Sequence, residues 1–283
     1  MNSAAILPPG LYVTATPIGN AADISLRALE TLRACDAIVA EDTRVTAKLL
    51  AIYGISKPLS AYNDHNAVRE RPKLLAKLRG GARLVLVSDA GTPLVSDPGF
   101  KLVREALAEG VKVEALPGAS APLVALTLSG LPSDKFLFAG FPGTRSGERR
   151  TLFEKLRAVP ASLIFFESPQ RLAASLADMA AVLGDRPAAV TRELTKLHEE
   201  VRRGPLSELA AHYAEAGPPR GEVTLVVGPP LDEGPDWSKA DTLLTQALAF
   251  MPVRAAVELV TEALGLPHRE TYARALALKR ETP

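Results

Sequence analysis

The chain has 283 residues, 47% of them hydrophobic and 23% charged, so it is long enough to bury a core and to form two domains or more. Its 33 basic and 32 acidic residues give a net charge of +1, which argues against general nucleic-acid binding through an overall positive field. Cys35 is the only cysteine and the four histidines are scattered, so we expect no disulfide and no metal site. Without a signal-like or membrane-spanning run, a cytoplasmic location is expected.

In the first half, short apolar runs alternate with helical patterns. The predicted strands are 11–15, 37–40, 84–87 and 111–116, and the predicted helices are 25–34, 43–52, 67–79 and 100–109. This order is typical of β-α-β units, which predicts an α/β fold with a mostly parallel sheet covered on both faces. A further helix is expected after residues 117–121, with the free N–H groups of its first turn facing outward.

The pattern restarts after Leu131-Pro132-Ser133, which places a domain boundary at residue 132. The predicted strands are 136–139, 163–166, 188–190 and 223–227, and the predicted helices are 147–157, 170–183 and 205–214. After the breaker-rich segment 228–235 the pattern is purely helical. We therefore expect two α/β domains, 1–132 and 133–230, with a cleft between them, and a small helical domain over 231–283.

The helical tail has one apolar stripe, a tight turn at 265–267 and a basic helix over 268–279. The stripe consists of Val253, Ala256, Val257, Val260 and Leu264. Such an arrangement suggests a helix-turn-helix-like module, and a helical packing or dimer extension fits it equally well.

Basic residues gather in three stretches, 69–83, 145–157 and 192–203. They would suit a polyanion track, since phosphate contacts supply most non-specific nucleic-acid affinity. Solvated helix faces are the competing interpretation.

A buried strand over 84–87 leads into a glycine- and proline-rich loop, 88–99, and loops of this kind hold ligands. Asp89 and Asp97 in this loop would repel a pyrophosphate and favour a ligand that is cationic or rich in hydroxyl and amino donors. The alternative is a plain connection in which Asp and Ser cap the following helix.

Other predicted strands also end in polar loops. These are 16–20, 41–44, 64–66, 165–171 and 192–199. Carboxyl ends of parallel strands share one edge of a sheet, so the loops should converge on a crevice, and a cleft between two domains is the default active site. Simple capping and local ion pairs, such as Glu167 with Arg171, remain the alternative. No dinucleotide, P-loop, nucleophile-elbow or zincin motif is present.

Six segments together resemble the ribosomal RNA small subunit methyltransferase I branch of the tetrapyrrole methylase superfamily. They are 16–20 (TPIGN), 41–44 (EDTR), 88–99 (SDAGTPLVSDPG), 117–121 (PGASA), 129–132 (SGLP) and 165–171 (FFESPQR). The resemblance runs from about Gly10 to Val227 and continues more weakly into the tail. It implies two α/β domains with S-adenosylmethionine in the cleft, usually a homodimer, and 2′-O-methylation of a cytidine in the decoding region of 16S ribosomal RNA.

The resemblance also implies site residues. The expected cofactor wall consists of Pro17, Asp89, Gly91, Thr92, Val95, Ser120, Ala121 and Phe166. A sulfonium cofactor with a ribose and an amino group suits the acidic, glycine-rich loop. The expected catalytic residues are Glu41, Glu167, His65, Arg44 and Arg171. Glu41 and Glu167 are the preferred candidates for proton removal or hydroxyl orientation, with Asp42 and His65 as further candidates, and the two arginines would grip phosphates.

Two alternatives stay open. The same fold could methylate a tetrapyrrole, although the basic stretches and the helical tail favour RNA, either naked 16S ribosomal RNA or the assembled small subunit. The second alternative is a non-catalytic RNA-binding factor for ribosome assembly that has a degenerate methylase fold. The intact 88–99 loop argues against this alternative.

Overall fold

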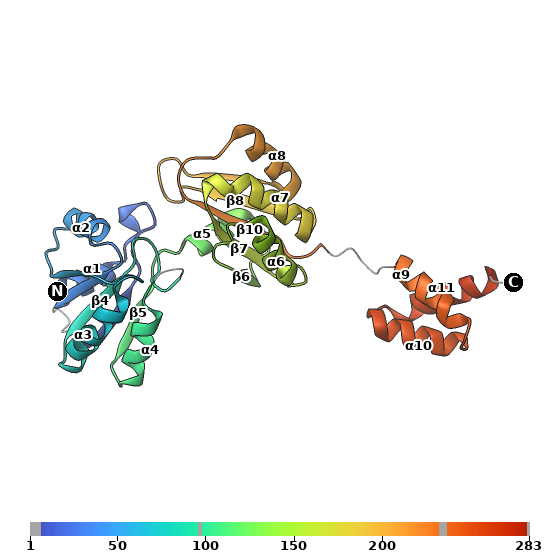
Figure 1. Ribbon diagram of the computed structural model, residues 1–283, viewed down its shortest axis with the longest axis horizontal. Helices are drawn as coiled ribbons and strands as arrows, with labels where there is room; N and C mark the ends of the chain where they lie inside the picture. The colour runs from blue at the N-terminus through green and yellow to red at the C-terminus, as the bar shows by residue number, and fades with distance from the viewer. Residues whose placement is uncertain (1–6, 96–97, 232–236, 282–283) are drawn as a thin grey trace. The chain divides into compact units, whose positions relative to one another are not determined.

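The computed structural model describes residues 7–95, 98–231 and 237–281. The chain forms two compact units, Met1–Pro230 and Leu231–Pro283. The first contains two five-stranded sheets, and the described part of the second is helical (Figure 1). The boundary predicted at residue 132, within the first unit, stays a prediction.

The first sheet is entirely parallel, in the order β3-β2-β4-β1-β5. Its strands are β1 (Gly10–Thr14), β2 (Ala37–Ala40), β3 (Leu59–Ala61), β4 (Arg83–Val87) and β5 (Val113–Leu116). One face packs on α1 (Leu26–Ala34) and α2 (Thr43–Ile52), the other on α3 (Ala67–Arg79) and α4 (Phe100–Ala108). The expected parallel sheet covered on both faces is confirmed. The three-residue β3 was not predicted, because so short a strand shows no alternation.

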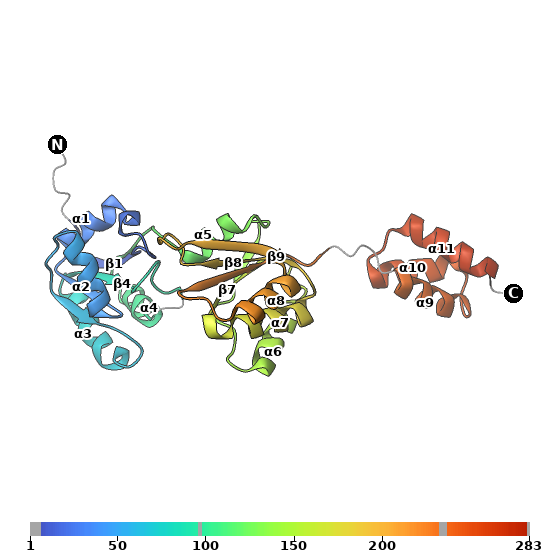
Figure 2. The same ribbon diagram turned by 90° about the horizontal axis from the view of Figure 1, so that it is seen from above.

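The second sheet is mixed, in the order β6-β7-β10-β8-β9, and only β6 and β7 run parallel. Its strands are β6 (Phe136–Phe138), β7 (Ser162–Glu167), β8 (Pro187–Arg192), β9 (Glu200–Pro205) and β10 (Val223–Val227). One face is covered by α6 (Ser146–Leu156), α7 (Leu172–Leu183) and α8 (Leu206–Ala216) (Figure 2). β9 was not predicted, because this edge strand carries adjacent arginines instead of an apolar run.

Helix α5 (Ala121–Ser129) covers the other face of the second sheet (Figure 2). Ala125 and Leu126 pack in one cluster with Ile164 of β7 and Val226 of β10. Ile18, from the loop after β1, belongs to the same cluster. A short apolar core therefore ties the first sheet's loops to the second sheet.

The helical unit consists of α9 (Trp237–Leu248), α10 (Val253–Leu264) and α11 (His268–Glu281). The predicted apolar stripe of α10 faces the unit's own core, in which Val257 and Val260 are fully buried. Gly265 ends α10 in the left-handed conformation, at φ +62°. Across the described residues, no helix has both the length and the apolar character needed to cross a membrane.

Many of the basic residues are neutralised by neighbouring acids. Arg71 pairs with Glu105 at 2.9 Å between α3 and α4, and Arg192 pairs with Glu200 at 2.9 Å between β8 and β9. Arg149 is buried against Asp178. These pairs favour the interpretation of the basic stretches as paired or solvated faces over a continuous polyanion track.

The loop after β1 touches the loop between β8 and β9. The Asn20 backbone N–H donates to Thr195 Oγ1 at 3.0 Å. A Cβ atom on Gly19 would lie 2.5 Å from Lys196 Cγ and 2.7 Å from Thr195 Oγ1. Residue 19 must therefore be glycine for the two loops to approach this closely.

Gly19→Ala should lower the free energy of unfolding in urea by about 1–3 kcal/mol, because the added methyl group overpacks this contact. The matched control is Gly147→Ala in α6, where a Cβ meets no described atom within 4 Å. That control should be neutral or should gain up to about 1 kcal/mol from the better helix former. Equal stability of the two variants would contradict the close contact.

Candidate active site

Two backbone hydrogen bonds hold the loops after β1 and β4 together. Thr16 and Gly91 form an isolated antiparallel bridge, with N···O distances of 2.9 and 3.0 Å. Thr16 Oγ1 donates to the Ser88 carbonyl at 3.2 Å, and Ser88 Oγ donates to the Gly91 carbonyl at 3.1 Å. Gly91 has φ +80°, which a residue with a side chain rarely adopts. The predicted ligand loop is thus folded back over the sheet edge.

The same loop is tied to its other neighbours. Asp89 Oδ1 accepts the Asp42 backbone N–H at 2.8 Å, and Thr92 Oγ1 donates to the Ala119 carbonyl at 3.1 Å. The loops after β1, β2, β4 and β5 therefore converge, as expected for a parallel sheet. Asp97, the second acid predicted to shape this loop, lies outside the described residues.

A cavity of about 530 Å³, here called the apolar cleft, lies between these loops and the second sheet. Seven of the eight residues predicted for the cofactor wall line it: Asp89, Gly91, Thr92, Val95, Ser120, Ala121 and Phe166. Pro17 does not, although its neighbour Ile18 does. The volume suits a ligand of nucleoside size or somewhat larger.

Sequence reasoning missed Phe141 and the segment 221–224 of this lining, whereas Ser168 and Pro169 belong to the 165–171 loop expected at the crevice. Phe141 follows β6 in a turn that is rich in glycine and proline. The 88–99 loop has the same composition after a strand, so this signal could have identified Phe141 as a candidate lining residue. Residues 221–224 precede or begin β10, and β10 is antiparallel to β7, with Val223 opposite Glu167. The start of β10 therefore lies where β7 ends, which no parallel pattern would indicate.

Aromatic rings form one wall of the apolar cleft. The Phe166 ring lies 4.9 Å from Phe138 and 5.4 Å from Phe141, measured between centroids. Phe141 is 56% exposed although it belongs to this cluster. Such a surface suits a flat ring system of a ligand.

Glu167 ends β7 with its side chain 0% exposed. Its Oε1 accepts the Ser168 backbone N–H at 2.7 Å and Arg171 Nε at 2.9 Å. No hydrogen-bond donor reaches its Oε2 from any described residue. A buried carboxylate oxygen without a partner is costly, and the ion pair of the same carboxylate with Arg171 offsets part of that cost.

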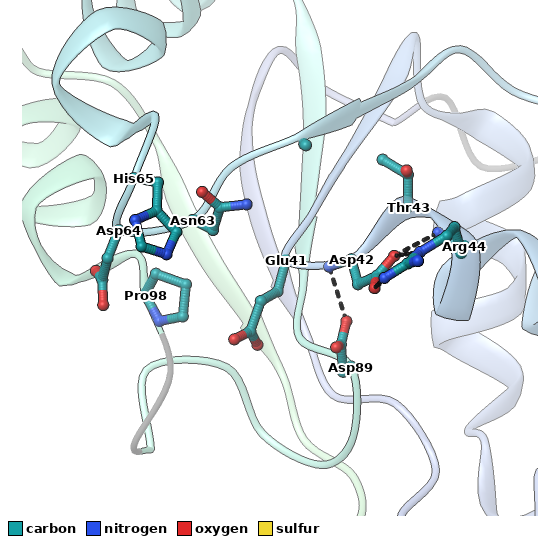
Figure 3. Close-up of a pocket in the computed structure, with 10 residues that line it drawn as sticks. Glu41, Asp42, Thr43, Arg44, Asn63, Asp64, His65, Asp89 and Pro98 are labelled. Carbon is teal, nitrogen blue, oxygen red and sulfur yellow. Dashed lines mark hydrogen bonds and ion pairs between the residues drawn. The ribbon is translucent and has the colours of Figure 1, made fainter.

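A second cavity of about 460 Å³, here called the polar pocket, lies beside the cleft (Figure 3). It contains the predicted residues Arg44 and His65, and it shares Glu41 and Asp89 with the apolar cleft. Arg171 lines neither cavity and is engaged by Glu167. The structure therefore brings Glu41, Arg44 and His65 together in one pocket and places Glu167 in the other.

Arg44 is held by the N-cap of its own helix. Asp42 Oδ1 accepts the Arg44 backbone N–H at 2.8 Å, and the Arg44 guanidinium pairs with the same carboxylate. This side-chain hydrogen bond, helped by the backbone bond, lowers the pKa of Asp42 to about 2. Arg44 is exposed and Asp42 is half-buried, and the pair lies to one side of Glu41 in the polar pocket (Figure 3).

The cleft fits the implied methyl donor. Phe166 and Phe141 offer a flat apolar surface, and Asp89 offers carboxylate oxygens to hydroxyl and amino groups. Among the described residues, no cluster of three or more His, Cys, Asp or Glu side chains could hold a metal ion.

Two family models match the chain. Residues 10–210 match the tetrapyrrole (corrin/porphyrin) methylases, and residues 234–279 match the RsmI C-terminal HTH domain. The first match runs from β1 into α8 and does not include the cleft residues 221–224, and the second covers nearly all of the described helical unit.

Relatives and solved structures agree with these matches. The chain is 53% identical to a ribosomal RNA small subunit methyltransferase I of Mesorhizobium japonicum, over 96% of this chain and 93% of the relative. It is 52% identical to one of Erythrobacter litoralis, over 98% of both chains. A diphthine synthase structure matches with a TM-score of 0.60 at 20% identity, covering 77% of this chain and 89% of that one. A Thermus thermophilus uroporphyrin-III C-methyltransferase complexed with S-adenosyl homocysteine matches with a TM-score of 0.55 at 21% identity, covering 77% and 97%. The structural matches show the shared fold.

Arg171→Met should lower the free energy of unfolding by about 3 kcal/mol, because it leaves the buried Glu167 carboxylate unpaired. Adding Glu167→Gln should recover a large part of that loss. The control is Lys73→Met in the exposed pair with Glu70, which should change stability by about 0.5 kcal/mol or less. If Arg171→Met costs no more than Lys73→Met in urea titrations, the pair does not stabilise the cleft wall.

Proposed function

This chain belongs to the tetrapyrrole methylase family and is an S-adenosylmethionine-dependent methyltransferase, and we propose that it methylates the ribose 2′-hydroxyl of a cytidine in the decoding region of 16S ribosomal RNA. The relatives named for the small ribosomal subunit, matched over nearly the whole chain, support this substrate. The apolar cleft, with its aromatic wall and the carboxylate of Asp89 in its glycine-rich loop, is the structural observation that carries the proposal.

The residues of the apolar cleft would make two kinds of contact with the methyl donor. When bound, S-adenosylmethionine supplies an electrophilic methyl group on a sulfonium. Phe166 and Phe141 would face its ring system, while Asp89 and Glu167 would accept hydrogen bonds from its hydroxyl or amino groups. Their carboxylates also favour a cationic ligand over a phosphate-bearing one.

The remaining tasks for the chain are to orient the acceptor hydroxyl and to take its proton. Glu41 and Glu167 are the proposed residues for these tasks. Glu41 lines both cavities, so it lies where a hydroxyl in the polar pocket would approach the contents of the cleft. Glu167 lines the apolar cleft but not the polar pocket, and this position favours a contact with the methyl donor.

The helical unit supports an RNA partner, because it matches a helix-turn-helix domain and α11 carries Arg269 and Lys279 in exposed positions. We also propose a cytoplasmic homodimer, in line with the family resemblance. A tetrapyrrole substrate would leave the role of this helical unit unexplained.

Glu41→Gln and Glu167→Gln, made separately, test the proton-handling proposal. Loss of a general base should slow single-turnover methyl transfer by about 100-fold or more, and at least one of the two variants should show this. Glu215→Gln, on the exposed surface of α8, is the matched control and should react like the wild type. Rates within about threefold of wild type for both variants would exclude the assignment.

Transfer of a tritiated methyl group from S-adenosylmethionine should label small-subunit ribosomal RNA, and mapping should place the label on one cytidine ribose. Purified small subunits and naked ribosomal RNA are compared as acceptors. Calorimetry with S-adenosylmethionine should show binding heat, which a non-catalytic RNA-binding module would not give. Cofactor binding without any labelling of either RNA form would overturn the proposed substrate.

A further inference from the structure

The polar pocket and the apolar cleft share Glu41 and Asp89 but differ in chemistry. Figure 3 shows Glu41 with its carboxylate directed into the space between Pro98 and Asp89. His65 lies above Pro98 on one side of this space, and the Asp42–Arg44 pair lies on the other. The two cavities are therefore adjacent sites that meet at Glu41 and Asp89.

The lining of the polar pocket offers hydrogen-bond acceptors to whatever enters. Glu41, Asp64 and Asp89 contribute carboxylates, and Asn63 contributes an amide that can both donate and accept. Arg44, the arginine in this lining, is already paired with Asp42. A phosphate inside the pocket would face carboxylates, whereas hydroxyl and amino groups would find partners.

We propose that the polar pocket binds the acceptor nucleoside, turned out of its RNA strand, with its ribose hydroxyl at Glu41 and its base at Asn63, Asp64 and His65. This inference rests on the proposed function. A pocket of about 460 Å³ is large enough for one nucleoside. Sequence-specific RNA recognition typically reads unstacked bases by their edges and by stacking on rings such as that of histidine, and enzymes that modify a nucleotide commonly extrude it from its stack.

The donors and acceptors of the pocket match cytosine better than uracil. Cytosine presents an amino group that a carboxylate accepts, and ring acceptors that an amide N–H can meet. Uracil presents a carbonyl oxygen at the place of the amino group, so this oxygen would face the Asp64 carboxylate. Asp64 therefore selects against uracil, and the Asn63 amide donates a hydrogen bond to a ring acceptor on the same edge of cytosine.

The phosphates of the flipped nucleotide remain outside the pocket. Arg44 lies at its mouth with 86% of its side chain exposed. A phosphate can take over this guanidinium from Asp42 in a bidentate contact. The pocket interior thus reads the nucleoside, while its rim contacts the RNA backbone.

The test uses the full chain with S-adenosylmethionine and small-subunit RNA that carries either cytidine or uridine at the mapped position. Single-turnover rates at increasing RNA concentration separate the RNA affinity from the transfer step. Wild type should favour cytidine by about 10- to 100-fold, the range for one good base contact. Asp64→Asn should reduce this preference to about threefold or less, and Asn63→Ala should weaken the apparent affinity for the cytidine RNA by about 10-fold.

The matched control is Asp134→Asn, an exposed acid that lines neither cavity, and it should keep the wild-type preference. Calorimetry with S-adenosylmethionine should give wild-type affinity for all three variants, which shows that each is folded and that the cleft is intact. If Asp64→Asn and Asn63→Ala both keep wild-type base preference and RNA affinity, the pocket is not the nucleoside site, although the proposed function stands. If wild type labels neither RNA, the proposed function itself fails.

Discussion

The backbone bridge between Thr16 and Gly91 is the constraint on which the site depends. Strands β1 and β4 are neighbours in a parallel sheet, so their loops leave the same edge, but nothing in a parallel ladder requires those loops to meet. The bridge brings them together, and the positive φ of Gly91 lets the chain turn back at that point. Asp89, two residues earlier, is then in position to accept the Asp42 N–H. Both cavities share the resulting wall.

The second sheet completes the cleft from the other side. Ile18 joins the apolar cluster of α5, β7 and β10, and the approach of Gly19 to Thr195 and Lys196 holds the facing loops together. The carboxyl end of β7 thereby presents Phe166 and Glu167 to the first sheet's loops. Packing between the sheets, more than any single hydrogen bond, decides how wide the cleft is.

Charge is distributed differently inside and outside the site. Outside, basic side chains such as Arg71 and Arg192 are largely matched by acids, which leaves the surface nearly neutral. Inside, carboxylates line both cavities, and the buried Oε2 of Glu167 lacks a donor among the described residues. A buried acceptor of this kind lowers the stability of the folded chain. This arrangement suits donor-rich, non-phosphate ligands in the interior of the site.

The sequence by itself determined the parallel first sheet and most helix positions, because strand periodicity and glycine-rich turns are local signals. The family motifs picked out seven residues that line one cavity, and their contact with a cofactor stays a prediction. Only the tertiary structure decided that α5 covers the second sheet and that the start of β10 lies beside Glu167, since an antiparallel pairing between distant segments leaves no local signal. The sequence equally hid that Arg44 and His65 lie in one cavity and Glu167 in another, with Glu41 lining both. Sequence motifs identify the residues that lie at a sheet edge, but the packing between the two sheets determines which of these residues line the same cavity.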